Sequence, residues 1–433
     1  MVLTSTRLLI ILVPIIVLGI LFTLPTLAQM FDSESNTSDT ILDSVKDTSN
    51  IESYSSDVNM INNSFPWGAN NEFALNMYDI IKDEPGENIF FSPISVFIAM
   101  AMSYEGTDGQ TASEIKDVFG LLPDDESRRN AIKSAIQTLG ANNTEYTLNV
   151  ANALWIKDTF NPYQRYVDVL STYYDSSVGK INTSQSSYDM INNWASDATN
   201  EKITNIIEPP IINGDTAIIL TNAVYFNGTW VSEFKPTATQ NRDFWVDSEN
   251  SIKTEMMKQS KSFNYTKIDG IKMIQMPYKG DRISMLAIIP DDSASMESLE
   301  KKLSMTSLSR WIDNMTPTAV GVLFPKFKIN VDYDLIPILK DAGIKDAFGE
   351  RANFFKLSDM PTYISNALHF AFVDVNEKGT EAAAVTVIVN DKISDDGILN
   401  AETFHADQPF IFMIWDSETN SILFIGKIIN PTI

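Results

Sequence analysis

Residues 373–404, VDVNEKGTEAAAVTVIVNDKISDDGILNAETF, form the most informative segment of the sequence. It begins as a strand, breaks at Lys378-Gly379, and runs through small residues into the β-branched sequence VTVIV at 385–389. As a simple surface loop this run would be prone to aggregation, and as a permanent strand it would start weakly. Two interpretations follow. The segment is an ordinary strand with an irregular entry, or it has two positions, an exposed loop and a strand inside a sheet.

Alternation along the segment bears on this choice, because successive side chains of a strand point to opposite faces. One face would carry small or uncharged residues, namely Thr380, Ala382, Ala384, Thr386 and Ile388. The other would carry Glu381, Ala383, Val385, Val387, Val389 and Asp391, with both charges at its ends. The alternation supports the second interpretation, and the first stays open.

The first half of the chain reads mainly as helices. In SPISVFIAMAMSYEG, Ser92 is placed as an N-cap, Pro93 as the first helical residue and Gly106 just beyond the end. Residues 96–102 are apolar on almost every face, so we expect this helix to be buried. The following helix should begin at a capping box formed by Thr111 and Glu114, and end at Gly120.

The second half is mainly strands, rich in Ile, Val, Phe and Tyr and separated by turn residues. These segments cover residues 216–230, 271–290, 319–331, 410–416 and 421–429. Helices followed by many strands predict an α+β architecture with antiparallel sheets. No linker-like break divides residues 65–433, so we expect one domain there.

The N-terminus differs from the rest of the chain. Arg7 precedes an apolar run that ends near small residues at Thr26 and Ala28, which predicts a secretory signal peptide over residues 1–28. The alternative is an uncleaved anchor over Leu8–Leu27, long enough to span a bilayer. Residues 29–64, of which 24 are Ser, Thr, Asn, Asp or Glu, read as a disordered acidic linker.

Composition excludes several classes of function. A net charge of −24 makes nucleic acid a poor partner. The absence of cysteine excludes disulfides, thiolate nucleophiles and cysteine metal sites, and two histidines, His369 and His405, leave little for imidazole catalysis. We therefore expect no enzyme activity, no metal and no cofactor.

Five segments together resemble a known family, the serpins. They are residues 88–115, 220–230, 375–385, 404–414 and 422–431, and they occur in the family's order and spacing over nearly all of Phe65–Pro431. The resemblance implies about eight or nine helices around a large mixed or antiparallel central sheet, with two smaller sheets and an exposed reactive loop. It also implies a suicide inhibitor of serine proteases, in which the cleaved loop inserts as a strand.

The resemblance assigns roles to particular residues of the loop. Its hinge matches at Glu377, Gly379, Thr380, Glu381, Ala382, Ala383 and Ala384, while Val385 is a mild departure. Counting from Glu377 places the reactive bond at Ile393–Ser394, which suggests an elastase- or subtilisin-like protease with an apolar primary pocket. A shift of one residue gives Lys392–Ile393 and a trypsin-like protease.

A second group matches the family's sheet-opening cluster, namely Ser92, Ser95, Asn222, Trp230 and His369. A basic helix bearing Arg128, Arg129 and Lys133 lies beside three acidic residues, so we expect no heparin-like activator. We expect a secreted monomer that forms loop–sheet polymers on heating, or a protein tethered to the cell surface by an uncleaved N-terminus. The alternative function is a non-inhibitory serpin that serves as a carrier, chaperone or plain substrate.

Overall fold

The computed structural model of the chain describes residues 65–83, 88–140, 145–291, 294–380 and 401–433. All of them belong to one compact unit, Asp57–Ile433. The predicted signal peptide and acidic linker lie outside the described residues, as does the possible anchor at Leu8–Leu27. Among the helices that are described, none is long and apolar enough to cross a membrane.

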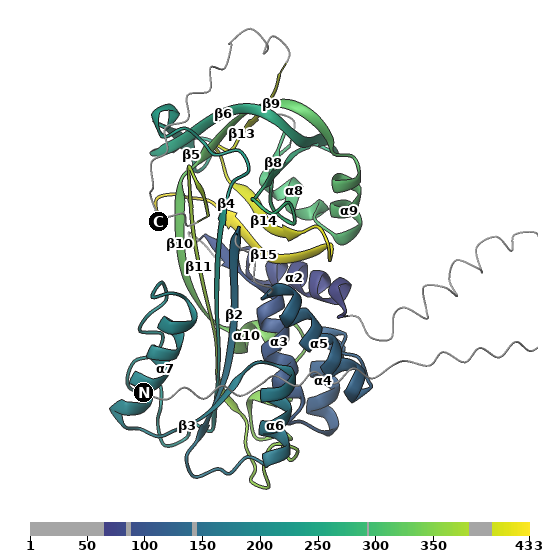
Figure 1. Cartoon of the computed structure of the whole chain (residues 1–433), viewed down its shortest axis with the longest axis vertical. Helices are drawn as coiled ribbons and strands as arrows, with labels where there is room; N and C mark the ends of the chain where they lie inside the picture. The colour runs from purple at the N-terminus through teal and green to yellow at the C-terminus, as the bar shows by residue number, and fades with distance from the viewer. Residues whose placement is uncertain (1–64, 84–87, 141–144, 292–293, 381–400) are drawn as a thin grey trace, which may run out of the picture. The chain divides into compact units, whose positions relative to one another are not determined.

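Nine α-helices occur in the described part of the chain, in agreement with the expected number (Figure 1). They are α2 (Trp67–Ile81), α3 (Pro93–Tyr104), α4 (Gly109–Phe119), α5 (Asp125–Leu139), α6 (Gln164–Tyr173), α7 (Gln185–Ala198), α8 (Met296–Lys302), α9 (Met305–Asp313) and α10 (Leu335–Asp341). Short 3-10 turns follow at Pro236–Ala238 and Asp346–Phe348.

Helix α3 forms as the sequence predicts. It begins at Pro93 after an extended Ser92, and every residue from 96 to 102 is fully buried. The prediction for α4 is wrong at its start, because the N-cap is Asp108 and Thr111 lies inside the helix. Glu114 instead accepts backbone hydrogen bonds from Lys345 and Asp346. A tertiary contact 231 residues away therefore takes the carboxylate that the local spacing assigned to a capping box.

Fifteen strands complete the described secondary structure. They are β1 (Ile89–Phe91), β2 (Tyr146–Lys157), β3 (Ser177–Ile181), β4 (Ile218–Thr229), β5 (Gln240–Trp245), β6 (Ser251–Ile268), β7 (Ile271–Pro277), β8 (Ile283–Pro290), β9 (Thr316–Pro325), β10 (Phe327–Asp334), β11 (Ile364–Asn376), β12 (Gly379–Thr380), β13 (Glu402–His405), β14 (Phe410–Asp416) and β15 (Ser421–Ile428). The architecture is α+β, as expected.

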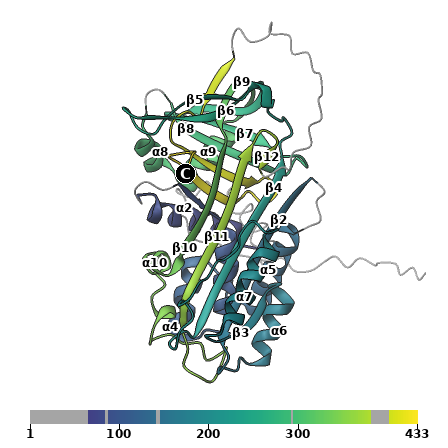
Figure 2. The same ribbon diagram turned by 90° about the vertical axis from the view of Figure 1, so that its left-hand side faces the viewer.

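One sheet has six strands in the order β10-β11-β12-β4-β2-β3 and mixes parallel and antiparallel pairs (Figure 2). Strands β11 and β4 also pair directly with each other, in parallel, from Ile364 to Phe372. This is the central sheet that the sequence predicts, although β2 and β3 fall in the half of the chain for which the sequence predicts mainly helices.

The second sheet has nine strands, β1-β15-β14-β8-β7-β6-β9-β13, with β5 paired to β6. The two smaller sheets that were expected are thus joined in one hydrogen-bonded sheet. The join is possible because β6 is 18 residues long and pairs with β7 through its last five residues and with β9 through ten residues of its middle part.

Two apolar clusters cover the two faces of the six-stranded sheet. The main cluster includes α3, the nine-stranded sheet and inward residues such as Val224, Phe226 and Val373. The second lies under α7 and includes Tyr225 and Phe372 on the opposite face. Figure 1 shows α7 on one side of these strands and α3 on the other. Any strand placed between β4 and β11 would therefore be covered on both faces.

Candidate functional site

Two residues of the predicted hinge are part of the six-stranded sheet. Gly379 and Thr380 form β12, which pairs antiparallel with β11 on one side and β4 on the other. Thr380 lies between Val375 of β11 and Gly228 of β4. The next direct pair between β11 and β4 is Phe372 with Tyr225, so a gap of two residue positions lies below β12.

Gly379 is required by this close approach. A Cβ atom at residue 379 would lie 1.9 Å from the carbonyl oxygen of Gly228. Any side chain would therefore separate β12 from β4. The close approach of β4 therefore explains why residue 379 is a glycine.

Thr380 is fully buried, and its hydroxyl is hydrogen-bonded to the Tyr278 hydroxyl at 2.6 Å. Tyr278 stacks on Trp230 with ring centroids 4.3 Å apart. The Trp230 backbone amide donates to Lys378 O at 2.8 Å, and its indole N–H donates to Asn376 O at 3.1 Å. Trp230 therefore lies where the chain turns from β11 into the hinge.

Glu377 anchors the base of the same turn. Its carboxylate accepts a hydrogen bond from Thr239 Oγ1 at 2.8 Å and lies 3.5 Å from Lys326 Nζ. Its carbonyl oxygen accepts from the Phe234 amide at 2.8 Å. The remaining hinge residues Glu381, Ala382, Ala383 and Ala384 lie outside the described residues, as do Lys392, Ile393 and Ser394.

A buried polar cluster joins β11, β4 and α3 in the main core. His369 Nδ1 and Ser95 Oγ both contact Asn222 Oδ1, and the Ser92 amide donates to His369 Nε2 at 3.2 Å. All four residues are fully buried. His369 and Asn222 are also paired across β11 and β4, so their contact ties together the two strands that flank the hinge.

The structure adds Asn152 of β2, which sequence reasoning missed. Asn222 Nδ2 donates to Asn152 Oδ1 at 2.6 Å, which extends the cluster across three strands. An asparagine within the apolar segment NALWI was the available signal, because buried polar side chains need partners. Tyr278 had no such signal, because its partner is 102 residues away.

Burial lowers the pKa of His369 to about 3. The neutral imidazole donates from Nδ1 to Asn222 and accepts at Nε2 from Ser92, an assignment that follows from the hydrogen bonds. Protonation would place a second N–H against the Ser92 amide. The closed cluster therefore requires a neutral histidine.

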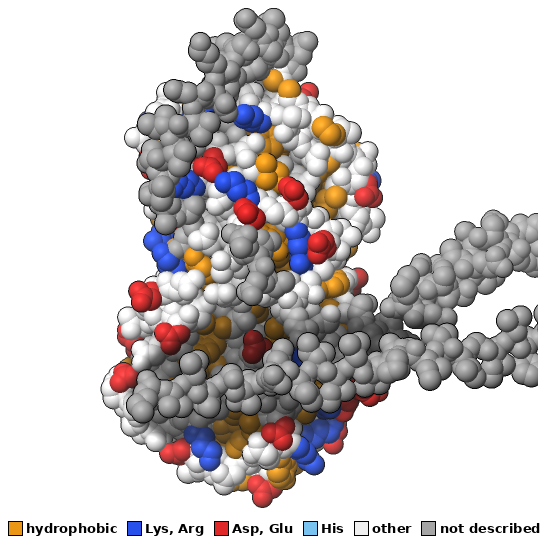
Figure 3. Space-filling model, viewed as in Figure 1, with side chains coloured by type: hydrophobic (Ala, Val, Ile, Leu, Met, Phe, Trp, Pro, Cys, Tyr) orange, Lys and Arg blue, Asp and Glu red, His pale blue; other side chains and the backbone are white. Residues whose placement is uncertain are grey.

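The two arginines of α5 are paired with one internal carboxylate. Arg128 and Arg129 both donate to Glu105, at 2.9 Å and 2.6 Å for their closest contacts. Tyr174 donates to the same carboxylate at 2.8 Å. Figure 3 shows acidic and basic side chains interspersed on the face it displays. That no polyanion activator binds stays a prediction, made from the three acidic residues that precede Ser127 in the sequence.

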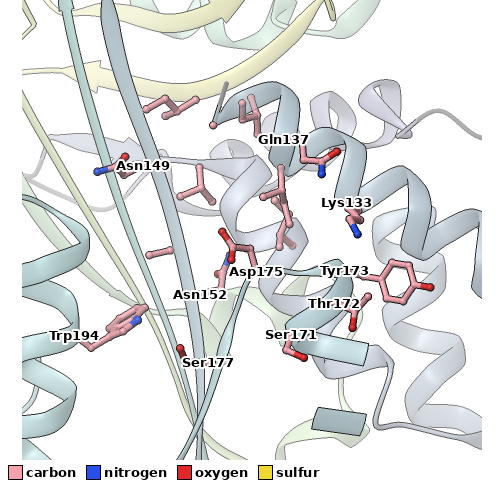
Figure 4. A pocket seen from close by; sticks show the side chains of 17 residues that line it. Lys133, Gln137, Asn149, Asn152, Ser171, Thr172, Tyr173, Asp175, Ser177 and Trp194 are labelled. Carbon is pink, nitrogen blue, oxygen red and sulfur yellow. The ribbon is translucent and has the colours of Figure 1, made fainter. Parts of the chain in front are cut away.

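A cavity of about 720 Å³ lies between α5, α6 and β2, with Trp194 of α7 at one end (Figure 4). Lys133, Tyr173 and Asp175 line it, and Asn152 connects it to the polar cluster. No group of three His, Cys, Asp or Glu residues able to hold a metal occurs in the described part of the chain.

The pKa of His369 generates a prediction about pH. The unfolded chain binds a proton near pH 6.5 and the folded protein does so only near pH 3, so acidification between these values favours unfolding. Lowering the pH from about 7 to about 5.5 should cost the wild type about 1 kcal/mol more than His369→Gln, measured by urea unfolding. His405→Gln, which alters the exposed histidine, is the control. Equal losses in wild type and His369→Gln would contradict the assigned neutral state.

Comparison with known proteins completes this picture. A family model described as Serpin (serine protease inhibitor) matches residues 68–431. An uncharacterized serpin-like protein of Methanosarcina acetivorans is 38% identical over 369 residues, covering 84% of this chain and 85% of that protein. Thyroxine-binding globulin, solved in complex with thyroxine, is 29% identical with a TM-score of 0.76, covering 84% and 99% of the two chains. Serpin48 of the insect Tenebrio molitor is 30% identical with a TM-score of 0.75, covering 84% and 97%. The chain belongs to the serpin family.

Proposed function

We propose that this serpin is an exported suicide inhibitor of serine proteases, which it traps by inserting its cleaved loop between β4 and β11. The observation that carries this proposal is β12, because the first two residues of the loop already pair with both strands. Cleavage would release the distal end of the loop. The segment could then continue downward in the register that β12 sets.

That register places the later loop residues in environments that suit them. Each residue after Thr380 would pair one position earlier on both β11 and β4. Even-numbered residues would face the main cluster, where Ala382 would lie beside Val373 and Phe226. Odd-numbered residues would face the cluster under α7, where Ala383 would lie beside Phe372 and Tyr225. Small and β-branched side chains fit both faces, and insertion would bury them.

The length of the site also agrees with the loop. In this register residue 390 would lie opposite Ile218, the first residue of β4. Residues 380–390 would then span about 36 Å at 3.3 Å per residue. A reactive bond at Ile393–Ser394 lies just beyond that length, so an acyl-enzyme attached there would be carried to the far end of the sheet.

The barrier to insertion in the intact protein is the existing seam. Residue 383 is the first that would have to separate a direct β11–β4 pair, Phe372 with Tyr225. Further insertion must also part His369 from Asn222. The inserted form would be the more stable one, and the intact form would persist because opening the seam is slow.

The expected target is an elastase- or subtilisin-like protease cleaving Ile393–Ser394, with Lys392–Ile393 and a trypsin-like protease as the alternative. Export follows from the predicted signal peptide at residues 1–28, and an uncleaved segment would leave the protein tethered. The second candidate function is a non-inhibitory carrier, because thyroxine-binding globulin has the same fold and was solved with thyroxine. Gly379, Thr380 and the alanines that follow favour the inhibitor, since bulky or charged hinge residues would impede insertion.

The direct test is incubation with elastase-, subtilisin-, chymotrypsin- and trypsin-like proteases, followed by denaturing electrophoresis and sequencing of the released peptide. We expect a covalent complex and a cut at Ile393–Ser394. Thr380→Arg should be cut at the same bond but turned over as a substrate, because residue 380 is fully buried in β12 and an arginine held there during insertion would be an unpaired buried charge, at a cost of several kcal/mol. A Thr380→Arg protein that still traps protease one-to-one would refute loop insertion.

The register yields a second prediction, at Thr386. Six positions below Thr380 this residue would lie between His369 and Asn222, where its hydroxyl would offer a partner to the separated polar groups. Wild-type protein nicked in the loop should melt well above the intact form. Thr386→Val should reduce that gain, by a loss of about 1–3 kcal/mol, without changing the melting of the intact protein.

Thr386→Ser retains the hydroxyl and should behave as the wild type in the same measurement. Val387→Thr places the isosteric change on the face under α7 and tests for a general effect of the loop sequence. A Thr386→Val protein whose nicked form gains as much stability as the wild type would show that the register is different.

A further inference from the structure

Tyr278 is a buried residue that brings the two sheets together at the hinge. It follows β7 of the nine-stranded sheet, yet it forms an isolated β-bridge with Trp230 at the end of β4. On either side of it, the Val231 amide donates to Pro277 O at 2.9 Å and the Lys279 amide donates to Thr229 O at 2.8 Å. The Tyr278 backbone is therefore fixed to the upper end of β4.

Its side chain is equally constrained. The ring stacks on Trp230 at 4.3 Å and makes an edge contact with Phe226 at 5.0 Å. A Cβ atom added at Gly228 would lie 2.9 Å from Tyr278 and Phe226 ring atoms, so the ring occupies the space above that glycine. The hydroxyl consequently has one fixed position, at the upper end of the gap between β4 and β11.

Within the described residues, that hydroxyl has one hydrogen-bond partner, Thr380 Oγ1 at 2.6 Å. Both residues are fully buried. Withdrawal of the hinge would leave the phenol without a partner in an apolar site between Trp230 and Phe226. An unpaired buried hydroxyl is unfavourable, so the pair stabilises the docked hinge.

The Tyr278 hydroxyl also favours residue 380 over its neighbours 379 and 381 at this position. A slip by one residue would bring Gly379 or Glu381 opposite Tyr278. A glycine has no side-chain partner to offer the hydroxyl, and a glutamate would bring a charge into this buried site. Such a slip would also turn every later side chain to the other face of the sheet. Glu381 would then point into the main apolar cluster, where a charge is costly.

We propose that Tyr278 is a positioning residue that holds Thr380 as the leading residue of the loop and sets the register in which the loop inserts. Docking of the hinge is a property of the intact protein, while the effect on trapping rests on the proposed inhibitory function. Tyr278 would act through Thr380 and would not touch the protease.

The test is a double-mutant cycle with Tyr278→Phe, Thr380→Val and the two combined. Each single change leaves one buried hydroxyl without its partner, whereas the pair replaces both by apolar groups of nearly the same shape. Hydrogen exchange of the backbone amides of residues 379 and 380 reports on hinge docking without any protease. We expect exchange to accelerate about tenfold in each single variant and to return toward the wild-type rate in the double variant.

The fraction of covalent complex formed with a susceptible protease provides the second readout, and it should fall in each single variant and recover in the double. Tyr166→Phe, which removes another buried tyrosine hydroxyl far from the hinge, controls for general loss of stability. Additive acceleration of exchange in the double variant, or no acceleration in any variant, would overturn the proposal.

Recovery of exchange without recovery of trapping would overturn the register-setting role and leave only the docking of the hinge. If the wild type forms no covalent complex with any protease, the inhibitory function fails, and the exchange cycle still decides whether Tyr278 holds the hinge.

Discussion

The parallel seam between β11 and β4 is the constraint on which the rest of the structure depends. These strands pair directly from Ile364 to Phe372 and then diverge, and Gly379 and Thr380 lie between them above a gap of two residue positions. Parallel strands that adjoin directly need their hydrogen bonds to one another, yet both can also pair with an antiparallel strand placed between them. The proposed insertion would replace the direct pairing of β11 and β4 by two antiparallel pairings with the strand placed between them.

The structure around the seam is compatible both with direct β11–β4 pairing and with the proposed inserted strand. Cover on both faces, from the main core and from α7, means that an inserted strand would be buried without further rearrangement of layers. The polar cluster lies on the seam itself, since His369 and Asn222 face each other across it and Asn152 extends it to β2. Buried hydrogen bonds resist opening, and they demand new partners once the seam has opened.

The sequence predicted the buried helix, about half of the strands and the mixed central sheet. Those features depend on local pattern, or on motifs such as the glycine and threonine at 379–380. It missed β2, whose polar residues interrupt its apolar pattern, and it misassigned Glu114, whose partners lie 231 residues away. It also missed Tyr278 and Asn152. Their roles arise from contacts between distant strands, which no local spacing reveals.

The most direct test of the account is a reversible lock on the seam. The chain has no cysteine, so Val224→Cys with Ala371→Cys would place a single disulfide across one β4–β11 pair. The account predicts that the oxidised protein is cleaved without trapping protease and that reduction restores trapping. Val331→Cys with Ala371→Cys, which links β10 to β11 instead, should trap in both states. A protein with the seam locked that still forms covalent complex would contradict insertion between β4 and β11.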